Sequence, residues 1–182
     1  MPRLTELPLE ELLRLQRQSL GKGRIIPAAE ELDSRIGGLG FAVGDLYLVC
    51  ELDSVSDIVD CGALTMVPRT KAWMRGITNV RGRLCSICDL GMFLGIAPPV
   101  PEAEGKLLVL SDPELGAALL VPRVFGLRYF DEETEQQAME GLDEKLRSLA
   151  KAAYLQGGHM WGVLDVERLA EMPRFRTVAD GM

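Results

Sequence analysis

The sequence is poor in histidine and in long apolar runs. Its 182 residues include one histidine, His159, which excludes every site that needs two histidines. No apolar run approaches the roughly 20 residues that a membrane-spanning helix needs. The first twenty residues carry Glu6, Glu10 and Glu11 and contain no uninterrupted apolar core, so they lack the pattern of a secretory signal. We therefore expect a cytoplasmic protein without direct membrane insertion.

A surplus of basic residues is also missing. Twenty Lys and Arg face 27 Asp and Glu, for a formal net charge of −7. A protein this acidic has no general attraction for nucleic acid or anionic lipid. Hydrophobic residues make up 47% and charged residues 26% of the chain, the mix of an ordinary folded protein. The length allows one good core or two small, closely joined subdomains.

Catalytic and metal-binding signatures are sparse. The sequence has no Gly-x-Ser-x-Gly elbow and no Walker-type loop, and His159 follows two glycines, as a turn residue between strands does. Cys85 and Cys88 have the spacing of a metal or redox pair. They fall in an expected strand, however, where residues three apart point to opposite faces. We expect buried, reduced thiols, no metal, no cofactor and no enzymatic activity.

Short strands separated by turn residues dominate the expected secondary structure. The expected strands cover residues 41–43, 46–52, 55–59, 83–88, 106–111, 117–121, 124–130, 154–156 and 160–164. The expected helices cover residues 5–20, 68–77, 90–94, 142–153 and 166–172. This pattern favours small β-barrels over a parallel α/β sheet.

Two segments of the sequence repeat each other. Residues 82–93 align with residues 158–169 without a gap, and both read as a glycine, a strand, an aspartate and a short helix. Asp89 and Asp165 stand where an N-cap is needed, because a carboxylate there accepts from the free N–H groups of the next turn. The spacing is too long for a solenoid and predicts two similar subdomains.

Residues 68–83 form the strongest electrostatic feature, with five basic residues and no acidic one. Contact with nucleic acid, with Trp73 stacking on bases, is one interpretation, but the net charge argues against it. A solvated helix face with Trp73 packed inside is a second. A protein-binding patch is the third, because Trp and Arg dominate interface energies and a local basic patch steers an acidic partner.

The same segment carries a family signature. Residues 73–95 read W-x-x-G-I-x-N-V-R-G-x-L-x-x-I-x-D-L-x-x-x-L-G, which closely resembles the signature of CheW-like domains, the adaptors of bacterial chemosensory arrays. Residues 40–44 and 55–58 resemble the first hairpin and the following strand of that family, and residues 162–165 resemble its last strand. The resemblance covers about residues 39–172.

The resemblance implies a mainly β fold with short helices, built as two five-stranded SH3-like β-barrel subdomains that share a core, plus an N-terminal helix. It divides the chain into an N-terminal helix and linker (1–38), a CheW-like domain of two interleaved subdomains (39–175) and a tail (176–182). It implies a non-catalytic adaptor that binds the regulatory domain of a CheA-type histidine kinase and the cytoplasmic tip of a methyl-accepting receptor, at membrane-associated receptor arrays. The helix expected at 5–20 either docks on a partner or packs on its own domain.

The resemblance also carries over candidate partner-binding residues. These are Val55, Asp57, Trp73, Arg75, Gly76, Asn79, Arg81 and Gly82. We expect Gly76 and Gly82 to permit tight backbone turns, and Asn79 and Arg81 either to brace the loop or to reach the partner. Two positions depart from the family pattern, since Ser86 replaces the usual proline and Asp57 the usual glutamate.

Within the family, three features favour the adaptors of twitching-motility systems, which control type IV pili. A leucine-rich extension precedes the domain, the sequence of residues 71–84 is similar to that of the twitching-motility adaptors, and no receiver domain follows. The adaptor of a flagellar chemotaxis pathway is the alternative.

Overall fold

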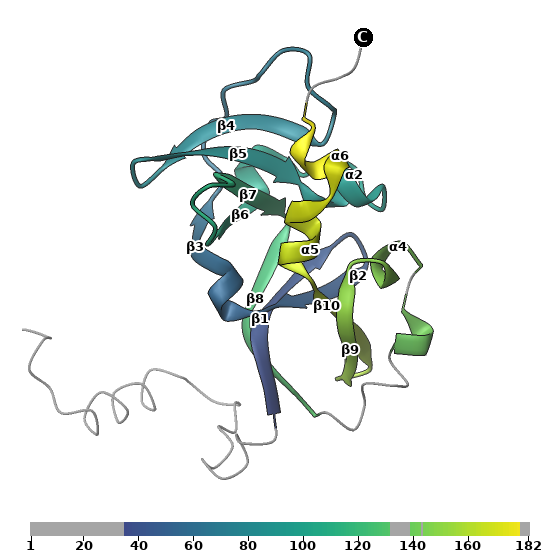
Figure 1. Cartoon of the computed structure of the whole chain (residues 1–182). Helices are drawn as coiled ribbons and strands as arrows, with labels where there is room; N and C mark the ends of the chain where they lie inside the picture. The colour runs from purple at the N-terminus through teal and green to yellow at the C-terminus, as the bar shows by residue number, and fades with distance from the viewer. Residues whose placement is uncertain (1–34, 132–138, 143, 179–182) are drawn as a thin grey trace, which may run out of the picture. The chain divides into compact units, whose positions relative to one another are not determined.

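A computed structural model describes residues 35–131, 139–142 and 144–178 of the chain (Figure 1). The helix expected at 5–20 lies outside these residues, as does most of the acidic segment between 131 and 144. In the described part, ten strands form two five-stranded sheets joined by short helices. The expected fold class is confirmed.

The first sheet has the strand order β8-β1-β2-β10-β9, and the second has β3-β6-β7-β5-β4. The first comprises β1 (Arg35–Val43), β2 (Leu46–Cys50), β8 (Arg123–Asp131), β9 (Ala150–Gln156) and β10 (His159–Leu164). The second comprises β3 (Val55–Asp60), β4 (Met74–Val80), β5 (Arg83–Asp89), β6 (Lys106–Leu110) and β7 (Ala117–Val121). β1 therefore begins four residues before Leu39, where the sequence placed the start of the domain.

The two sheets share one topology, which confirms the internal repeat. In each, a hairpin (β9–β10 or β4–β5) pairs in parallel with an interior strand (β2 or β7), and the other pairings are antiparallel. The second sheet uses consecutive strands β3 to β7, whereas the first combines β1 and β2 with β8 to β10. The second sheet is therefore inserted into the first along the chain, and the first sheet is complete only after the chain has passed through the second.

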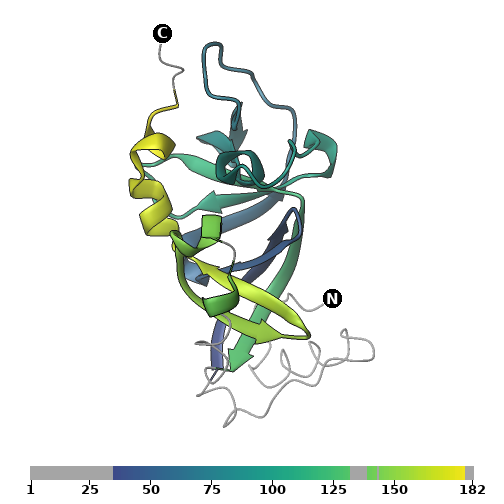
Figure 2. The ribbon, with the colours of Figure 1, turned by 90° about the vertical axis from the view of Figure 1, so that its right-hand side faces the viewer.

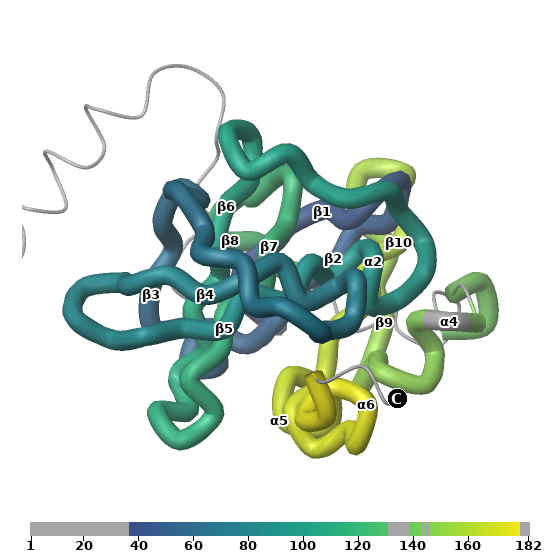
Figure 3. Tube along the Cα trace, turned by 90° about the horizontal axis from the view of Figure 1, so that it is seen from above, coloured from purple at the N-terminus to yellow at the C-terminus, as the bar shows by residue number. Residues whose placement is uncertain are grey.

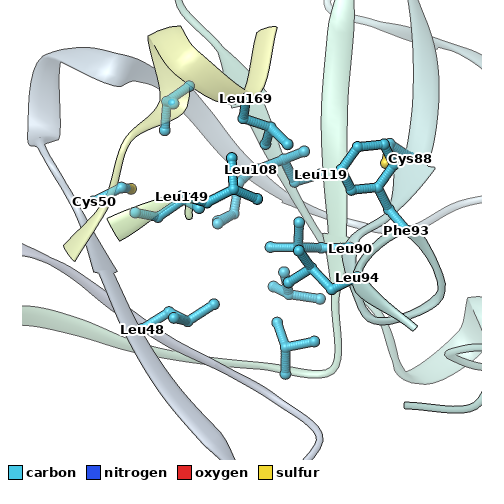
Figure 4. Packing of buried hydrophobic residues seen from close by; sticks show 14 of the residues in the cluster. Leu48, Cys50, Cys88, Leu90, Phe93, Leu94, Leu108, Leu119, Leu149 and Leu169 are labelled. Atoms are coloured by element: carbon cyan, nitrogen blue, oxygen red, sulfur yellow. The ribbon is translucent and has the colours of Figure 1, made fainter. Parts of the chain in front are cut away.

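Three apolar clusters fill the structure. The largest takes residues from both sheets and from the helices, including Leu48, Leu119 and Leu169 (Figure 4). A second cluster, with Ile87 and Leu120, belongs to the second sheet, and a third, with Trp161, belongs to the first. The shared core that the family resemblance implies is the first of these clusters.

Short helices end the equivalent strands of the two halves. They are α2 (Leu90–Leu94) after β5 and α5 (Val166–Glu171) after β10. The described residues also include α4 (Glu144–Arg147), α6 (Pro173–Arg176) and the 3-10 turns η2 (Leu52–Ser54) and η3 (Glu102–Glu104). The Asp89 carboxylate accepts from the Met92 N–H at 3.1 Å, and that of Asp165 from the Arg168 N–H at 2.9 Å. Both expected N-caps are confirmed. Figure 2 shows α5 and α6 together along one side of the sheets.

The helix expected over residues 68–77 is wrong. Residues 74–80 form β4, and the preceding residues make turns. Thr65 and Ile77 exchange two backbone hydrogen bonds of 2.9 Å, which cover the outer edge of β4. Gly76 has φ +141°, and a Cβ there would lie 2.6 Å from the Thr65 carbonyl oxygen. This close approach of two backbones selects the strand, a long-range effect that local helix propensity does not register.

The helix expected over residues 142–153 is wrong over its second half. α4 is a single turn, and β9 already begins at Ala150. Ala152 and Ala153 pair with Val163 and Gly162 of β10. Alanine has the highest helix propensity, but here its small side chain lets β9, an edge strand of the first sheet, pack closely on the shared core, where Ala153 is fully buried.

Candidate functional site

The turn between β4 and β5 has a strained first residue. Arg81 has φ +51° and Gly82 has φ +88°, the two left-handed positions of a type I′ hairpin turn. The equivalent turn between β9 and β10 uses two glycines, Gly157 and Gly158, at φ +59° and +79°. A left-handed conformation costs a non-glycine residue about 1–2 kcal/mol. Arg81 therefore carries a backbone cost that the other half of the molecule avoids.

Side chains around this turn are tied to one another. The Asn79 Oδ1 accepts from the Gly82 N–H at 2.8 Å, so Asn79 braces the turn. The Arg81 guanidinium pairs with the Asp57 carboxylate at 2.7 Å, yet 73% of the Arg81 side chain remains exposed. Arg81 can thus hold Asp57 and meet a partner at the same time.

These contacts also join the two edges of the second sheet. β3 and β4 are its edge strands, and in Figure 3 the β4–β5 hairpin reaches past β3. Asp57 and Ser56 lie on β3, and the Arg83 guanidinium donates to the Ser56 Oγ at 3.0 Å. The first sheet has a similar link, in which the Gln156 amide of β9 donates to the Tyr129 carbonyl of β8. Both sheets therefore curl toward closed barrels.

The structure brings together four of the eight candidate residues, namely Asp57, Asn79, Arg81 and Gly82. Val55 begins β3 and packs half-buried against the large core. Two apolar side chains of this sheet face solvent, since Ile58 on β3 is 46% exposed and Leu84 on β5, opposite Asn79, is 65% exposed. We call Asp57, Ile58, Asn79, Arg81, Gly82 and Leu84 the hairpin surface.

The sequence pattern did not predict that the Leu84 side chain is exposed to solvent. Leu84 belongs to a strand whose later residues Cys85, Ile87 and Cys88 are all buried, so the apolar run gave no sign that its first members face solvent. Its place directly after a two-residue turn was the one available signal, because side chains at a hairpin end extend beyond the sheet.

The other three candidates lie away from the hairpin surface. Trp73 is 9% exposed and packs edge-on against Phe93 and parallel to Phe175, with ring centroids 5.2 and 6.0 Å away. Gly76 makes the close approach to Thr65 described above. Trp73 is thus buried, as the second interpretation of residues 68–83 has it, but in a turn before β4 and not on a helix.

Arg75 neutralises a buried carboxylate. Its guanidinium donates to Asp89 Oδ2 at 3.2 Å and to the Val100 carbonyl at 2.9 Å, and Asp89 is fully buried. The Asp89 carboxylate also accepts from the Val100 N–H at 2.8 Å. A buried charge persists only when it is paired and hydrogen-bonded, and Arg75 meets that need. The basic residues of 68–83 therefore do not share one solvated helix face, and that interpretation is wrong.

The cysteines are placed for packing. Cys85 belongs to the cluster of the second sheet and Cys88 to the shared core, which confirms that they point to opposite faces of β5. Burial raises the pKa of the Cys50 thiol to about 12, and it also raises the pKa of Cys61 and Cys88. These thiols are poor nucleophiles. Among the described residues, no three of His, Cys, Asp or Glu gather closely enough to hold a metal ion.

His159 lies at the start of β10, and its ring stacks on Tyr47 with centroids 4.2 Å apart. In the part of the chain that the structure describes, no helix is long and apolar enough to cross a membrane. The hairpin surface offers ion pairing, hydrogen bonding and apolar contact, which are the means of binding another protein.

Comparison with known proteins gives one consistent result. Residues 37–174 match the CheW-like domain. The chain is 27% identical over 174 residues to the protein PilI of Pseudomonas aeruginosa, covering 96% of this chain and 97% of PilI. It is 25% identical over 136 residues to the chemotaxis protein CheW of Thermotoga maritima, covering 73% and 86%. The crystal structure of the scaffolding protein TtCheW from Thermoanaerobacter tengcongensis has the same fold, with a TM-score of 0.63, 17% identity and coverage of 76% and 94%.

Proposed function

The chain belongs to the CheW-like domain family, and from that premise we propose that it couples methyl-accepting receptors to a CheA-type histidine kinase in a type IV pilus system. A role as a CheW-like scaffold adaptor in chemosensory signalling follows from the family and its relatives. The finer assignment to twitching motility is supported by the extent of the PilI match, which spans 96% of this chain against 73% for the T. maritima CheW. The protein would act at membrane-associated receptor arrays.

The mechanism involves binding without catalysis. The adaptor contacts the regulatory domain of the kinase and the cytoplasmic tip of the receptor, and it transmits signal because each partner biases the conformations available to the other. An effect of this kind needs two interfaces on one rigid body. The shared core, which takes residues from both sheets, provides that rigidity.

The kinase contact is assigned to the hairpin surface. The observation that carries this assignment is Arg81, which keeps a left-handed backbone at φ +51° and a side chain that is 73% exposed. Glycine at this position would relieve the strain, so the side chain itself is the reason to keep arginine. Exposed Leu84 and Ile58 add the apolar area that protein interfaces use beside arginine.

Calorimetric titration into the regulatory domain of each CheA-type kinase of the organism tests the proposal. We expect saturable binding to one kinase, loss of binding in Arg81→Glu, and unchanged binding in the control His159→Ala. Binding to the kinase of a twitching-motility pathway supports the pilus assignment, whereas binding only to that of a flagellar pathway supports the alternative. Absence of binding to every kinase contradicts the coupling role.

A further inference from the structure

Two hollows adjoin on the side of the second sheet where α5 and α6 lie. The first has a volume of about 400 Å³, and its apolar lining includes Trp73, Met74 and Phe175. The second has a volume of about 200 Å³ and lies between η2, the end of β6 and α5. Asp112 and Leu115 line both hollows and so form the wall that the two share. We call the pair of hollows the α5 groove.

The α5 groove changes character along its length. Seven apolar residues line the first hollow, together with Ser86, Asp112, Glu114 and Arg176. Four carboxylates line the second, and its lining residues include no Lys or Arg. These are Glu51, Asp53, Asp112 and Glu167, above a floor that contains the buried Leu110 and Val166. An apolar compartment therefore adjoins an acidic one.

The wall between the two compartments is ordered. The Asp112 carboxylate accepts from the Glu114 and Leu115 N–H groups at 2.9 and 3.4 Å, which fixes the turn between β6 and β7. Figures 1 and 3 place this turn and α5 on the same side of the second sheet. Arg176, the one basic residue of the lining, donates its Nε–H to the Ala170 carbonyl at 2.9 Å.

We propose that the α5 groove binds an amphipathic α-helix of a partner protein, with a large apolar side chain in the first hollow and Lys or Arg side chains in the second. Charge complementarity selects the basic residues. Glu51 already pairs with Lys151 at 3.3 Å, but Asp53, Asp112 and Glu167 add three more carboxylates to a lining that contains no Lys or Arg, and an incoming cation lowers the repulsion among them. The apolar lining of the first hollow selects an anchoring side chain.

A helix fits this groove better than an extended strand does. Ser86, Cys88 and Ala117, which line the first hollow, lie on β5 and β7, which are interior strands whose ladder hydrogen bonds are already made. Met74 is the first residue of the edge strand β4, and its N–H already donates to the Lys71 carbonyl at 2.9 Å. An added strand would therefore find no free N–H on these lining residues to pair with. A helix satisfies its own backbone and needs only side-chain contacts. This surface is separate from the hairpin surface, and the inference does not rest on kinase binding.

The test uses the full chain and two designed peptides of about 18 residues, or about five helical turns. Both carry the same leucine face, and one has lysine and the other glutamate on the polar face. Nuclear magnetic resonance of the labelled protein reports the binding site. We expect the lysine peptide to shift the amide signals of Ser111, Leu115 and Glu167, and the glutamate peptide to leave them in place.

Charge variants test whether the lysine peptide binds at the α5 groove or is only attracted to the overall negative charge of the protein. Asp53→Lys combined with Glu167→Lys should weaken lysine-peptide binding by about tenfold or more, because it reverses two of the four charges. Asp53→Asn combined with Glu167→Gln should give a smaller loss in the same direction. The matched control, Glu104→Lys with Glu140→Lys, makes the same change in net charge on exposed residues elsewhere.

An unchanged affinity in that control supports the proposal. An equal loss in the control, binding of the glutamate peptide at the same place, or amide shifts confined to other surfaces would overturn it. The kinase titration described above is measured on the same variants, and its outcome is independent.

Discussion

Replacing Arg81 with glycine should weaken binding to the kinase while leaving the free energy of unfolding nearly unchanged. Glycine accepts φ +51° without the cost of about 1–2 kcal/mol that a side chain incurs. The change removes the ion pair with Asp57, which is worth about 0.2–1 kcal/mol for an exposed pair. It also raises the entropy of the unfolded chain, at a cost of about 0.4–1 kcal/mol. These terms nearly cancel, so we expect the free energy of unfolding to change by less than about 1 kcal/mol.

The same replacement should change the affinity for the kinase regulatory domain much more than it changes the stability of the fold. An arginine at the centre of an interface contributes about 2 kcal/mol, which corresponds to an increase in Kd of about 30-fold. Urea denaturation gives the stability of Arg81→Gly, and calorimetry gives its Kd. A variant as stable as the parent that binds about 30-fold more weakly fits the assignment of Arg81 to the interface.

Two matched variants sharpen this test. Gly157→Ala places a side chain at the equivalent turn, at φ +59°, where a Cβ would meet no atom within 4 Å. Its effect on stability therefore measures the left-handed cost of about 1–2 kcal/mol, less about 0.4–1 kcal/mol gained from the lower entropy of the unfolded chain, with no contribution from side-chain contacts. Asp57→Asn removes the ion pair and keeps Arg81. Unchanged kinase affinity in Arg81→Gly, or a loss of stability above about 2 kcal/mol, would refute the reasoning.

Three further predictions concern the scaffold. Asp89→Ala should destabilise the fold by about 3–5 kcal/mol in denaturant titration, because it leaves the Arg75 guanidinium without its buried partner; a loss below about 1 kcal/mol would contradict this role. Gly76→Ala should cost at least about 1 kcal/mol, since its Cβ would lie 2.6 Å from the Thr65 carbonyl oxygen, and near-parental thermal stability would argue against that contact. Burial raises the pKa of Cys50 from 9.0 to about 12, so the contribution of this thiol to the free energy of unfolding should be intact below pH 9 and fall by about 1.4 kcal/mol per pH unit between those two values. The raised pKa of Cys61 and Cys88 adds to the alkaline loss, so a Cys50→Ala variant should still lose stability there, but less steeply than the parent.

The sequence determined those features that depend on short-range rules. The two aspartate N-caps and the opposite faces of Cys85 and Cys88 follow from spacing within a few residues. The repeat of 82–93 in 158–169 indicated two similar halves, and the signature over 73–95 indicated the family. None of these conclusions required knowledge of which strands pair.

Only the tertiary structure decided the features that depend on distant residues. Residues 68–77 and 142–153 have locally helical patterns, but Thr65 and β10 hold parts of them as strands. The pairing of Arg81 with Asp57 joins residues on opposite edges of one sheet, and no local pattern predicts it. Trp73 and Arg75, which share a basic segment with Arg81, turn toward the core and toward Asp89. The physical reason is that a residue's burial and its partners depend on which segments pack against it, whereas caps and turns are fixed by the chain's own neighbours.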